Sequence, residues 1–272
     1  MDITLRWFGK KHDSVKLEYI KQIPGVTGVV SSLHDVPVGE AWKLEDILAL
    51  KNEVEAAGLK LIGIESVNVH EDIKIGLPSR EKYIENYKIS LENLGKADIH
   101  LVCYNFMPIF DWTRTDLAKE LEDGSFVLAY DENIIKDIKP EKMFERVEKE
   151  SGGFILPGWE PNRRDEIMDL FEKYKGVTAE KLMENLKYFL DAIMPVCEKY
   201  QIKMAIHPDD PAWSVFGLPR IVTSEKSLEE IAALNDSIYN GFTLCTGSLG
   251  SNLKNNLPDI IRNPKIKDRI HF

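Results

Sequence analysis

A histidine and a cysteine each close an apolar segment of this sequence, and the two segments are consecutive in the predicted order of strands. His207 ends the segment KMAIH at 203–207, and Cys245 lies in GFTLCT at 241–246. Neighbouring strands run about 4.8 Å apart, so side chains at their ends can reach one ion. An imidazole and a thiolate together suit a transition metal far better than Mg²⁺. We therefore predict that His207 and Cys245 are metal ligands, with the remaining ligands supplied from elsewhere.

Each of these two residues also has a purely structural explanation. A free cysteine in a strand is most often a small core side chain, and we assign Cys103 and Cys197 to the core on that ground. A histidine at a strand end can simply anchor a loop by a hydrogen bond. Residue types and spacing alone therefore indicate a barrel enzyme, and leave its dependence on a metal open.

Short apolar segments alternate with amphipathic ones, which predicts a repeated strand–helix unit. The apolar segments are apolar on both faces, as expected for a parallel sheet covered by helices. We predict an α/β fold, a (β/α)₈ TIM barrel, in which functional residues lie at the carboxyl ends of the strands. The strands are predicted at 3–8, 27–33, 60–66, 100–105, 203–207 and 241–246, and the helices at 13–22, 43–57, 80–94, 179–200 and 227–238.

An open doubly wound sheet is the alternative architecture. Against it, the first predicted strand–helix turn, WFGKKHDS at 7–14, lacks the glycine fingerprint of a dinucleotide-binding fold. The second helix is expected to stop at Gly58. Ser79 is a candidate N-cap for the next helix and Gly95 its stop, and Ser227 with Glu230 forms a candidate capping box for the last one.

Residues 108–176 interrupt the strand–helix rhythm. They contain many charges and the turn pairs at 152–153 and 157–158, so we predict a helical insertion after the fourth strand, within a single TIM-barrel domain that spans 1–272. RIHF at 269–272 is predicted to begin a seventh strand. Because an eight-stranded barrel needs further strand–helix units, we expect the barrel to be incomplete at the C-terminal end of this sequence.

Composition excludes several classes of partner. A net charge of -10 and a pI of about 5.2 argue against nucleic acid and anionic membranes, whose phosphates need a basic surface. The chain opens without an apolar signal segment, and its apolar runs stay well short of the roughly 18 residues of a membrane span. Its 3 widely spaced cysteines indicate a reducing compartment rather than a disulfide framework. We expect a cytoplasmic protein that acts on a small molecule.

Longer segments resemble the mannonate dehydratase family, in family order and over essentially the whole chain, insertion included. Strings such as CYNFMP followed by DWTRTDL are long enough to be specific to that family. The family has a xylose-isomerase-like TIM barrel, which agrees with the fold predicted from the strand–helix rhythm. The segments are LRWFG at 5–9, GVVSSLHDVPVGEAW at 28–42, ESVNVHEDIK at 65–74, VCYNFMPIFDWTRTDL at 102–117, AIHPDDP at 205–211, GLPRIV at 217–222 and NGFTLCTGSLG at 240–250.

The resemblance implies a hydro-lyase that converts D-mannonate into 2-keto-3-deoxy-D-gluconate and water, in hexuronate (glucuronate) catabolism. It also implies Mn²⁺ or Fe²⁺ held by two histidines, one cysteine and one aspartate, with His207 matching the first histidine and Cys245 the cysteine. Register places the second histidine, the aspartate and the catalytic arginine and tyrosine of the family beyond Phe272, so His271 is not taken as a ligand. We therefore expect residues 1–272 by themselves to show little dehydratase activity.

A sugar acid carries many hydroxyl groups, which polar side chains at the strand ends can bind. We predict such substrate contacts from Trp7, His34, Glu65, Asn105 and Asp209. Glu65 could instead be a structural ion-pair partner, and Asp209 could belong to a turn beside proline.

The sequence leaves two alternative functions open. One is a related sugar isomerase that moves a hydride between C1 and C2, and the other is a sugar-acid binding protein without catalysis. We further expect a homodimer, with no nucleic-acid or membrane partner.

Overall fold

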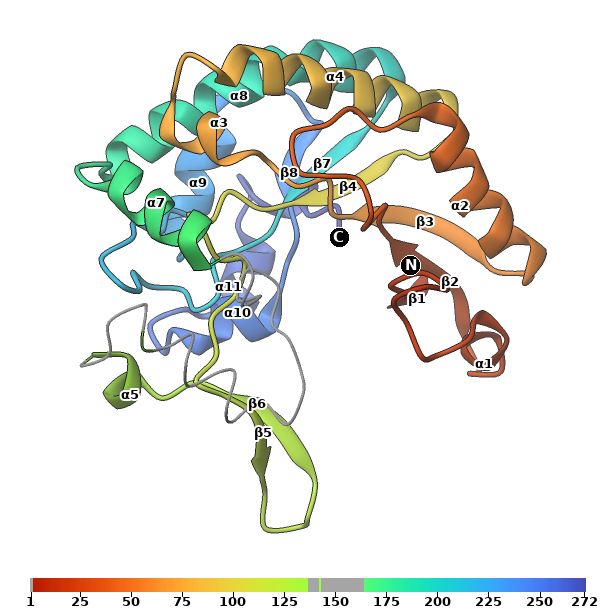
Figure 1. The fold of residues 1–272 in the computed structure, drawn as a ribbon, viewed down its shortest axis with the longest axis horizontal. Coiled ribbons are helices and arrows are strands. Elements are labelled where there is room, and N and C mark those ends of the chain that lie inside the picture. The colour runs from red at the N-terminus through yellow and green to blue at the C-terminus, as the bar shows by residue number, and fades with distance from the viewer. Residues whose placement is uncertain (1, 137–141, 143–163) are drawn as a thin grey trace.

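The strands of the main sheet follow one another in space in the same order as along the chain. The computed structural model describes residues 2–136, 142 and 164–272 (Figure 1). Its six-stranded sheet has the order β1-β2-β3-β4-β7-β8, and every neighbouring pair is parallel. A doubly wound sheet reverses its order at a switch point, so this sequential order excludes that alternative. The strands are β1 Ile3–Arg6, β2 Val26–Ser31, β3 Lys60–Glu65, β4 Leu101–Tyr104, β7 Lys203–Ile206 and β8 Asn240–Phe242.

Helices connect these strands and cover the outside of the sheet. Figure 1 shows α2, α4 and α8 side by side along one side of the strands. This is the repeated strand–helix arrangement of a TIM barrel, with helices outside and strand ends gathered at one end. The helices between the sheet strands are α1 Leu17–Lys21, α2 Leu44–Ala56, α3 Glu71–Ile75, α4 Arg80–Lys96, α8 Ala179–Tyr200 and α9 Glu225–Leu234, and after β8 come α10 Thr246–Ser251 and α11 Leu257–Arg262.

Helix α8 fixes the position of β7 and therefore of the histidine that follows it. The side-chain oxygen of Thr178 caps the helix by accepting a hydrogen bond from the Lys181 amide at 3.2 Å. Its apolar face, which includes Leu186, Phe189 and Ile193, is fully buried. The helix ends at Gln201 in the left-handed conformation, and the chain enters β7 two residues later. Burial of this face in the hydrophobic core fixes the helix, and thereby the start of β7, relative to the rest of the sheet.

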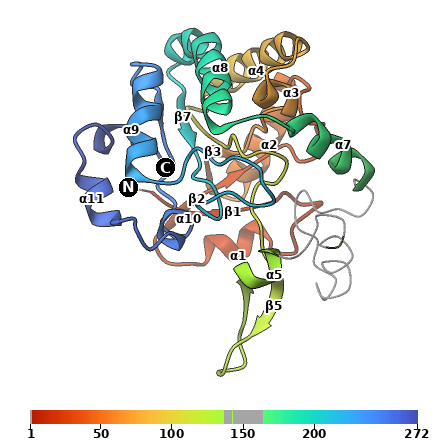
Figure 2. The same cartoon turned by 90° about the vertical axis from the view of Figure 1, so that its left-hand side faces the viewer.

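The segment between β4 and β7 lies outside the main sheet. It contains an antiparallel hairpin of β5 Asp116–Glu120 and β6 Phe126–Ala129, followed by α5 Glu132–Lys136 and, later, α7 Arg164–Tyr174. Figures 1 and 2 show the hairpin projecting away from the sheet. The described residues of the predicted helical insertion therefore include an antiparallel hairpin as well as helices. Gly152–Gly153 and Pro157–Gly158 lie outside the described residues.

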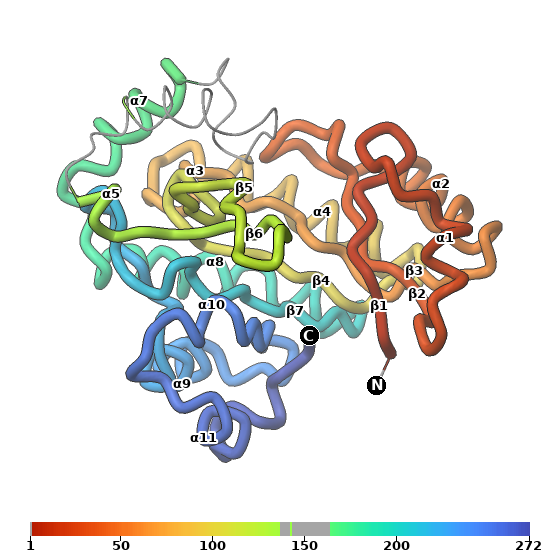
Figure 3. The backbone as a smooth tube through the Cα atoms, turned by 90° about the horizontal axis from the view of Figure 1, so that it is seen from below, coloured from red at the N-terminus to blue at the C-terminus, as the bar shows by residue number. Residues whose placement is uncertain are grey.

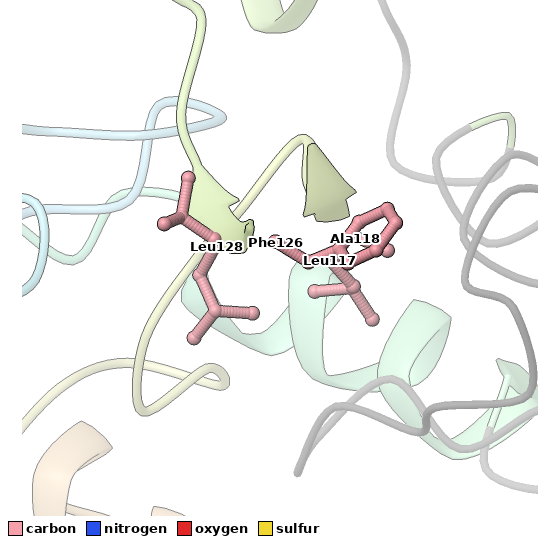
Figure 4. Close-up of a pocket in the computed structure, with 5 residues that line it drawn as sticks. Leu117, Ala118, Phe126 and Leu128 are labelled. Carbon is pink, nitrogen blue, oxygen red and sulfur yellow. The ribbon is translucent and has the colours of Figure 1, made fainter. Parts of the chain in front are cut away.

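The hairpin carries a shallow apolar hollow (Figure 4). No charged or hydrogen-bonding side chain lines it, so it offers no group for acid–base chemistry or for metal binding. Its lining residues are Leu117, Ala118, Phe126, Val127 and Leu128.

The predicted strands are confirmed, with ends that differ by at most four residues, and five of the described helices were predicted. The capping box was placed wrongly: α9 begins after Ser224, whose side chain caps Ser227, so the box is formed by these two serines and does not involve Glu230. Ser79 precedes α4, but its hydroxyl donates to Asp72 instead of capping the helix. Helices α3, α10 and α11 were not predicted, whereas α5 and α7 lie within the predicted helical insertion.

The predicted start of a seventh strand has partial support. Ile270 forms a parallel bridge with Phe242 of β8, and the amide of Leu244 donates to the carbonyl of Phe272 at 2.8 Å. The preceding residues Lys267–Arg269 form a short 3₁₀ helix. Figure 3 shows this last segment returning towards the sheet. The RIHF segment thus lies beside β8, as its apolar pattern indicated.

Close packing of β2 on β3 gives a test of this sheet. A Cβ atom at Gly28 would lie 2.3 Å from the carbonyl oxygen of Lys60, which is backbone and cannot swing away. We expect Gly28→Ala to lower the free energy of unfolding by about 1–3 kcal/mol, as overpacking does elsewhere. Urea unfolding followed by circular dichroism measures the loss. Gly250→Ala is the control, since its added atom meets only ordinary contacts; equal losses in both variants would contradict this packing.

Candidate metal centre and active site

His207 and Cys245 come together at the carboxyl ends of two paired strands. His207 directly follows β7, Cys245 lies three residues after β8, and Ile206 is in register with Phe242. The imidazole and the thiol lie close enough for each to shift the pKa of the other. Both residues are partly exposed, so the pair is open to an ion from the strand ends. The predicted convergence of the two side chains is present in the fold.

A hydrogen bond at Nδ1 of His207 determines which ring nitrogen is left free for a metal. Its Nδ1 lies 2.8 Å from the carbonyl oxygen of Pro208. A carbonyl oxygen can only accept, so Nδ1 carries the hydrogen and donates it. Nε2 is then the nitrogen with a free lone pair when the ring is neutral. Metal-binding histidines are usually oriented in this way by a hydrogen bond from the other ring nitrogen.

Electrostatics favour the charged forms of both members of the pair. Burial raises the pKa of the Cys245 thiol, but hydrogen bonds from His207 and Ser248 outweigh it and bring the pKa down to about 7. Burial lowers the pKa of His207, whereas the hydrogen bond with Cys245 raises it, and the net effect is a raised value. By contrast, burial raises the pKa of Cys103 to about 12. Cys245 is therefore the cysteine of this strand-end region that most readily supplies a thiolate.

Three polar residues form a chain of hydrogen bonds that ends at Cys245. The Ser248 hydroxyl lies 3.1 Å from Cys245 Sγ and 3.0 Å from Asp210 Oδ2. Arg114 holds Asp210 through two parallel hydrogen bonds of 2.7 and 3.0 Å. The guanidinium of Arg114 also lies 5.1 Å from the ring centre of Trp112. Sequence reasoning missed Arg114 and Ser248, although the spacing of three residues between Cys245 and Ser248 would have placed both on one turn of a helix.

The predicted substrate residues Glu65 and Asn105 lie at the same ends of the strands. Glu65 closes β3, contacts Arg6 of β1 at 3.5 Å, and lies close enough to His207 to raise its pKa. Asn105 follows β4, donates to Asp111 at 2.9 Å and accepts from the Met107 amide. Glu65 thus has the ion-pair partner that was considered for it. Arg6, which sequence reasoning did not single out, is an exposed cation beside Glu65.

Trp7, His34 and Asp209 have different surroundings. Trp7 is buried in the core and donates its indole N–H to Val15 at 3.1 Å, whereas His34 is exposed and stacks on Phe8. Asp209 is buried, accepts hydrogen bonds from two backbone amides, and faces Arg220. Its carboxylate therefore anchors the 217–222 loop. This arrangement supports a positioning role for Asp209 better than the predicted substrate contact.

The donor set fits a transition metal but is incomplete in the part of the chain that the structure describes. Thiolate and imidazole are the ligand types that such ions prefer. Within residues 2–136, 142 and 164–272, no group of three or more histidine, cysteine, aspartate or glutamate side chains is arranged to hold an ion. Two protein ligands leave coordination positions for other groups and for substrate oxygens. In the same residues, no helix is both long and apolar enough to cross a membrane.

Comparison with known proteins identifies relatives over the whole chain. The family D-mannonate dehydratase (UxuA) matches residues 1–272. The mannonate dehydratases of Brachyspira hyodysenteriae and Thermotoga neapolitana are 63% and 58% identical over 272 residues, covering 100% of this chain and 76% of each relative. A solved mannonate dehydratase from Streptococcus suis matches with a TM-score of 0.88 and 45% identity, covering 100% of this chain and 72% of that one. Together with the sequential strand order, this likeness confirms the predicted TIM-barrel fold.

Proposed function

The chain belongs to the D-mannonate dehydratase (UxuA) family, and from this premise we propose that His207 and Cys245 hold the divalent metal with which it dehydrates D-mannonate to 2-keto-3-deoxy-D-gluconate. The enzyme class is that of a hydro-lyase. The observation that carries the assignment of the two ligands is their position at the carboxyl ends of two paired strands, where each side chain shifts the pKa of the other. Imidazole and thiolate suit a transition metal, and the family resemblance implies that this metal is Mn²⁺ or Fe²⁺.

The reaction removes a proton from C2 and the hydroxyl group from C3. The electron pair of the C2–H bond forms a C2–C3 double bond, and the C3–O bond breaks as the hydroxyl leaves as water. The resulting enol takes up a proton at C3 and becomes the 2-keto acid. The C2 proton is very weakly acidic because it lies beside a carboxylate. A bound metal stabilises the negative charge that develops on the substrate oxygens as this proton leaves.

The described residues account for binding and orientation in this scheme. His207 presents Nε2 because Pro208 takes the hydrogen of Nδ1. Cys245 loses its proton to a metal readily near neutral pH, because its pKa is lowered to about 7. Glu65 and Asn105 at the neighbouring strand ends, with the exposed His34, are proposed to bind substrate hydroxyl groups. The buried side chains of Trp7 and Asp209 are proposed to hold these strand ends in place. The catalytic acid and base are not assigned to residues of this chain.

The cellular setting is part of the proposal. The 3 cysteines are all free, which agrees with a reducing compartment, and we propose the cytoplasm. The expected homodimer stays a prediction, and light scattering of the purified protein checks it.

Turnover of D-mannonate tests the proposed function. The protein expressed from its own gene, stripped of metal with a chelator and reloaded with Mn²⁺, is incubated with D-mannonate. We expect a 2-keto acid to form only in the reloaded sample. Formation of a ketose from an aldose, without any 2-keto acid, would replace the proposal by a sugar isomerase. Tight binding of D-mannonate without turnover would replace it by a binding protein.

A further inference from the structure

The hydroxyl group of Ser248 faces two acceptors with a single hydrogen. Asp210 Oδ2 lies 3.0 Å and Cys245 Sγ 3.1 Å from Ser248 Oγ. An ionised carboxylate and a thiolate can only accept, so the one hydroxyl hydrogen serves one of them at a time. Ser248 is buried, with 1% of its surface exposed, so bulk water does not reach the group freely. The acceptor that receives the Ser248 hydrogen therefore depends on how strong a hydrogen-bond acceptor Asp210 is.

Arg114 sets the acceptor strength of Asp210. Its guanidinium binds both carboxylate oxygens of Asp210, and one of these two bonds, at 3.0 Å, ends on the oxygen that faces Ser248. A carboxylate that already forms a bidentate ion pair with an arginine is a weaker acceptor for a further hydrogen bond. Trp112 lies against the guanidinium and keeps it in place. Asp210 and Arg114 are 15% and 21% exposed, so their attraction is only partly screened by water.

We propose that Arg114, Asp210 and Ser248 form a positioning relay. Arg114 makes the Asp210 carboxylate a weaker hydrogen-bond acceptor, so that Ser248 donates its hydroxyl hydrogen to the Cys245 sulfur. The relay rests on the proposed function, because its end point is the thiolate taken there as a metal ligand. A hydrogen bond to a metal-bound sulfur lowers the electron density that the sulfur gives to the ion and fixes the direction of the sulfur lone pairs. None of the three residues is proposed to touch the metal or the substrate.

The three residues come from separate parts of the chain. Arg114 lies in the insertion after β4, Asp210 in the loop after β7, and Ser248 in α10 after β8. A parallel β-bridge between Trp112 and Asp210, and the hydrogen bond from the Thr113 amide to the Asp210 carbonyl at 3.1 Å, join the first two segments. The insertion is therefore tied to the metal ligand through the relay, which gives the start of the insertion a role at the active site.

Cobalt(II) absorption tests the relay without relying on turnover. The apoprotein is titrated with Co²⁺ and the sulfur-to-cobalt charge-transfer band is recorded. For Ser248→Ala we expect the band at longer wavelength, because a sulfur without its hydrogen bond gives up an electron more easily. We also expect the Co²⁺ affinity to fall by roughly 10- to 100-fold, the usual effect of removing a partner of a metal ligand. Arg114→Met should shift the band in the same direction, since an unpaired Asp210 then draws the hydroxyl hydrogen away.

Ser248→Thr is the matched control, because it keeps the hydroxyl group and should restore both the wild-type band position and the affinity. An unchanged band and affinity in Ser248→Ala would overturn the relay. A threonine variant that behaves like the alanine variant would overturn it too, because the effect would then follow packing rather than the hydroxyl group. Absence of the band from the wild-type protein would instead overturn the ligand assignment of Cys245, and the relay with it.

Discussion

Cys245→Ser is expected to weaken Mn²⁺ binding by at least about 100-fold. Removing only a hydrogen-bond partner of a metal ligand lowers the metal affinity by about 10- to 100-fold, and removing the ligand itself should lower it further. Serine keeps the shape of the side chain but replaces a thiolate with a hydroxyl that stays protonated at neutral pH. Dehydration of D-mannonate should fall at least in parallel, since the metal then dissociates from the protein. His207→Ala should have an effect of similar size. Metal content after dialysis, measured by mass spectrometry, and the rate of 2-keto-acid formation check both losses.

The control for this experiment is Cys103→Ser. Cys103 lies on β4, is buried and hydrogen-bonds Thr243 at 3.2 Å, and burial raises its pKa to about 12. It therefore supplies no thiolate at neutral pH, and its replacement should leave metal content unchanged. Retention of wild-type metal content by Cys245→Ser would contradict the assignment. Equal loss in the Cys103 and Cys245 variants would show that the loss comes from a disturbed core.

The second large effect is expected on stability, at the buried pair of Asp209 and Arg220. The side chains are 1% and 0% exposed, and their closest atoms are 3.4 Å apart. Arg220→Met removes the positive charge and leaves a buried carboxylate with two backbone amides as its partners. Breaking a buried pair in this way costs about 3–5 kcal/mol. Urea unfolding at pH 7 measures the loss, and the double variant Asp209→Asn with Arg220→Met should lose clearly less, because it leaves no uncompensated charge.

The pH dependence of this loss follows from the direction of the Asp209 pKa. Burial raises the pKa of Asp209 above its ordinary value, while Arg220 opposes that rise. Without the arginine the pKa rises further, so the folded state of Arg220→Met binds a proton more readily than the unfolded state. A raised pKa in the folded state favours folding at low pH, and this contribution is lost as the pH rises through the folded pKa. The destabilisation should therefore shrink below neutral pH, and a loss that stays constant between pH 7 and pH 4 would contradict the mechanism.

Most of the sheet could be predicted from sequence because each strand is a short apolar run that ends in polar residues. His207 and Cys245 were predicted as a pair for the same reason, since consecutive parallel strands bring their carboxyl ends together. The hairpin β5–β6 was missed because it projects from the body and exposes Phe126 and Leu128, so its residues lack the inside–outside alternation of a half-buried strand. The capping box was misplaced because Ser227 with Glu230 fits the usual Ser-x-x-Glu pattern, whereas the observed pair Ser224 and Ser227 does not.

The roles of the two consecutive aspartates could not be predicted from their order. Asp209 turns into the core towards Arg220, while Asp210 turns towards Ser248 and Arg114. Their partners lie 11 to 96 residues away in sequence, so no local pattern distinguishes one aspartate from the other. Sequence reasoning singled out Asp209 for the substrate, whereas the geometry brings Asp210 to Ser248, which contacts the proposed ligand Cys245. Long-range partners, rather than the residue type, decide the role of each carboxylate here.

X-ray absorption of the metal-loaded protein tests the central claim, that His207 and Cys245 hold one ion, most directly. A sample loaded with a single equivalent of Zn²⁺ should show one sulfur neighbour at about 2.3 Å and imidazole nitrogen at about 2.0–2.1 Å. The sulfur neighbour should disappear in Cys245→Ser and persist in Cys103→Ser, and the imidazole signal should weaken in His207→Ala. A wild-type spectrum with only oxygen and nitrogen neighbours, or a sulfur neighbour that persists in Cys245→Ser, would contradict the account.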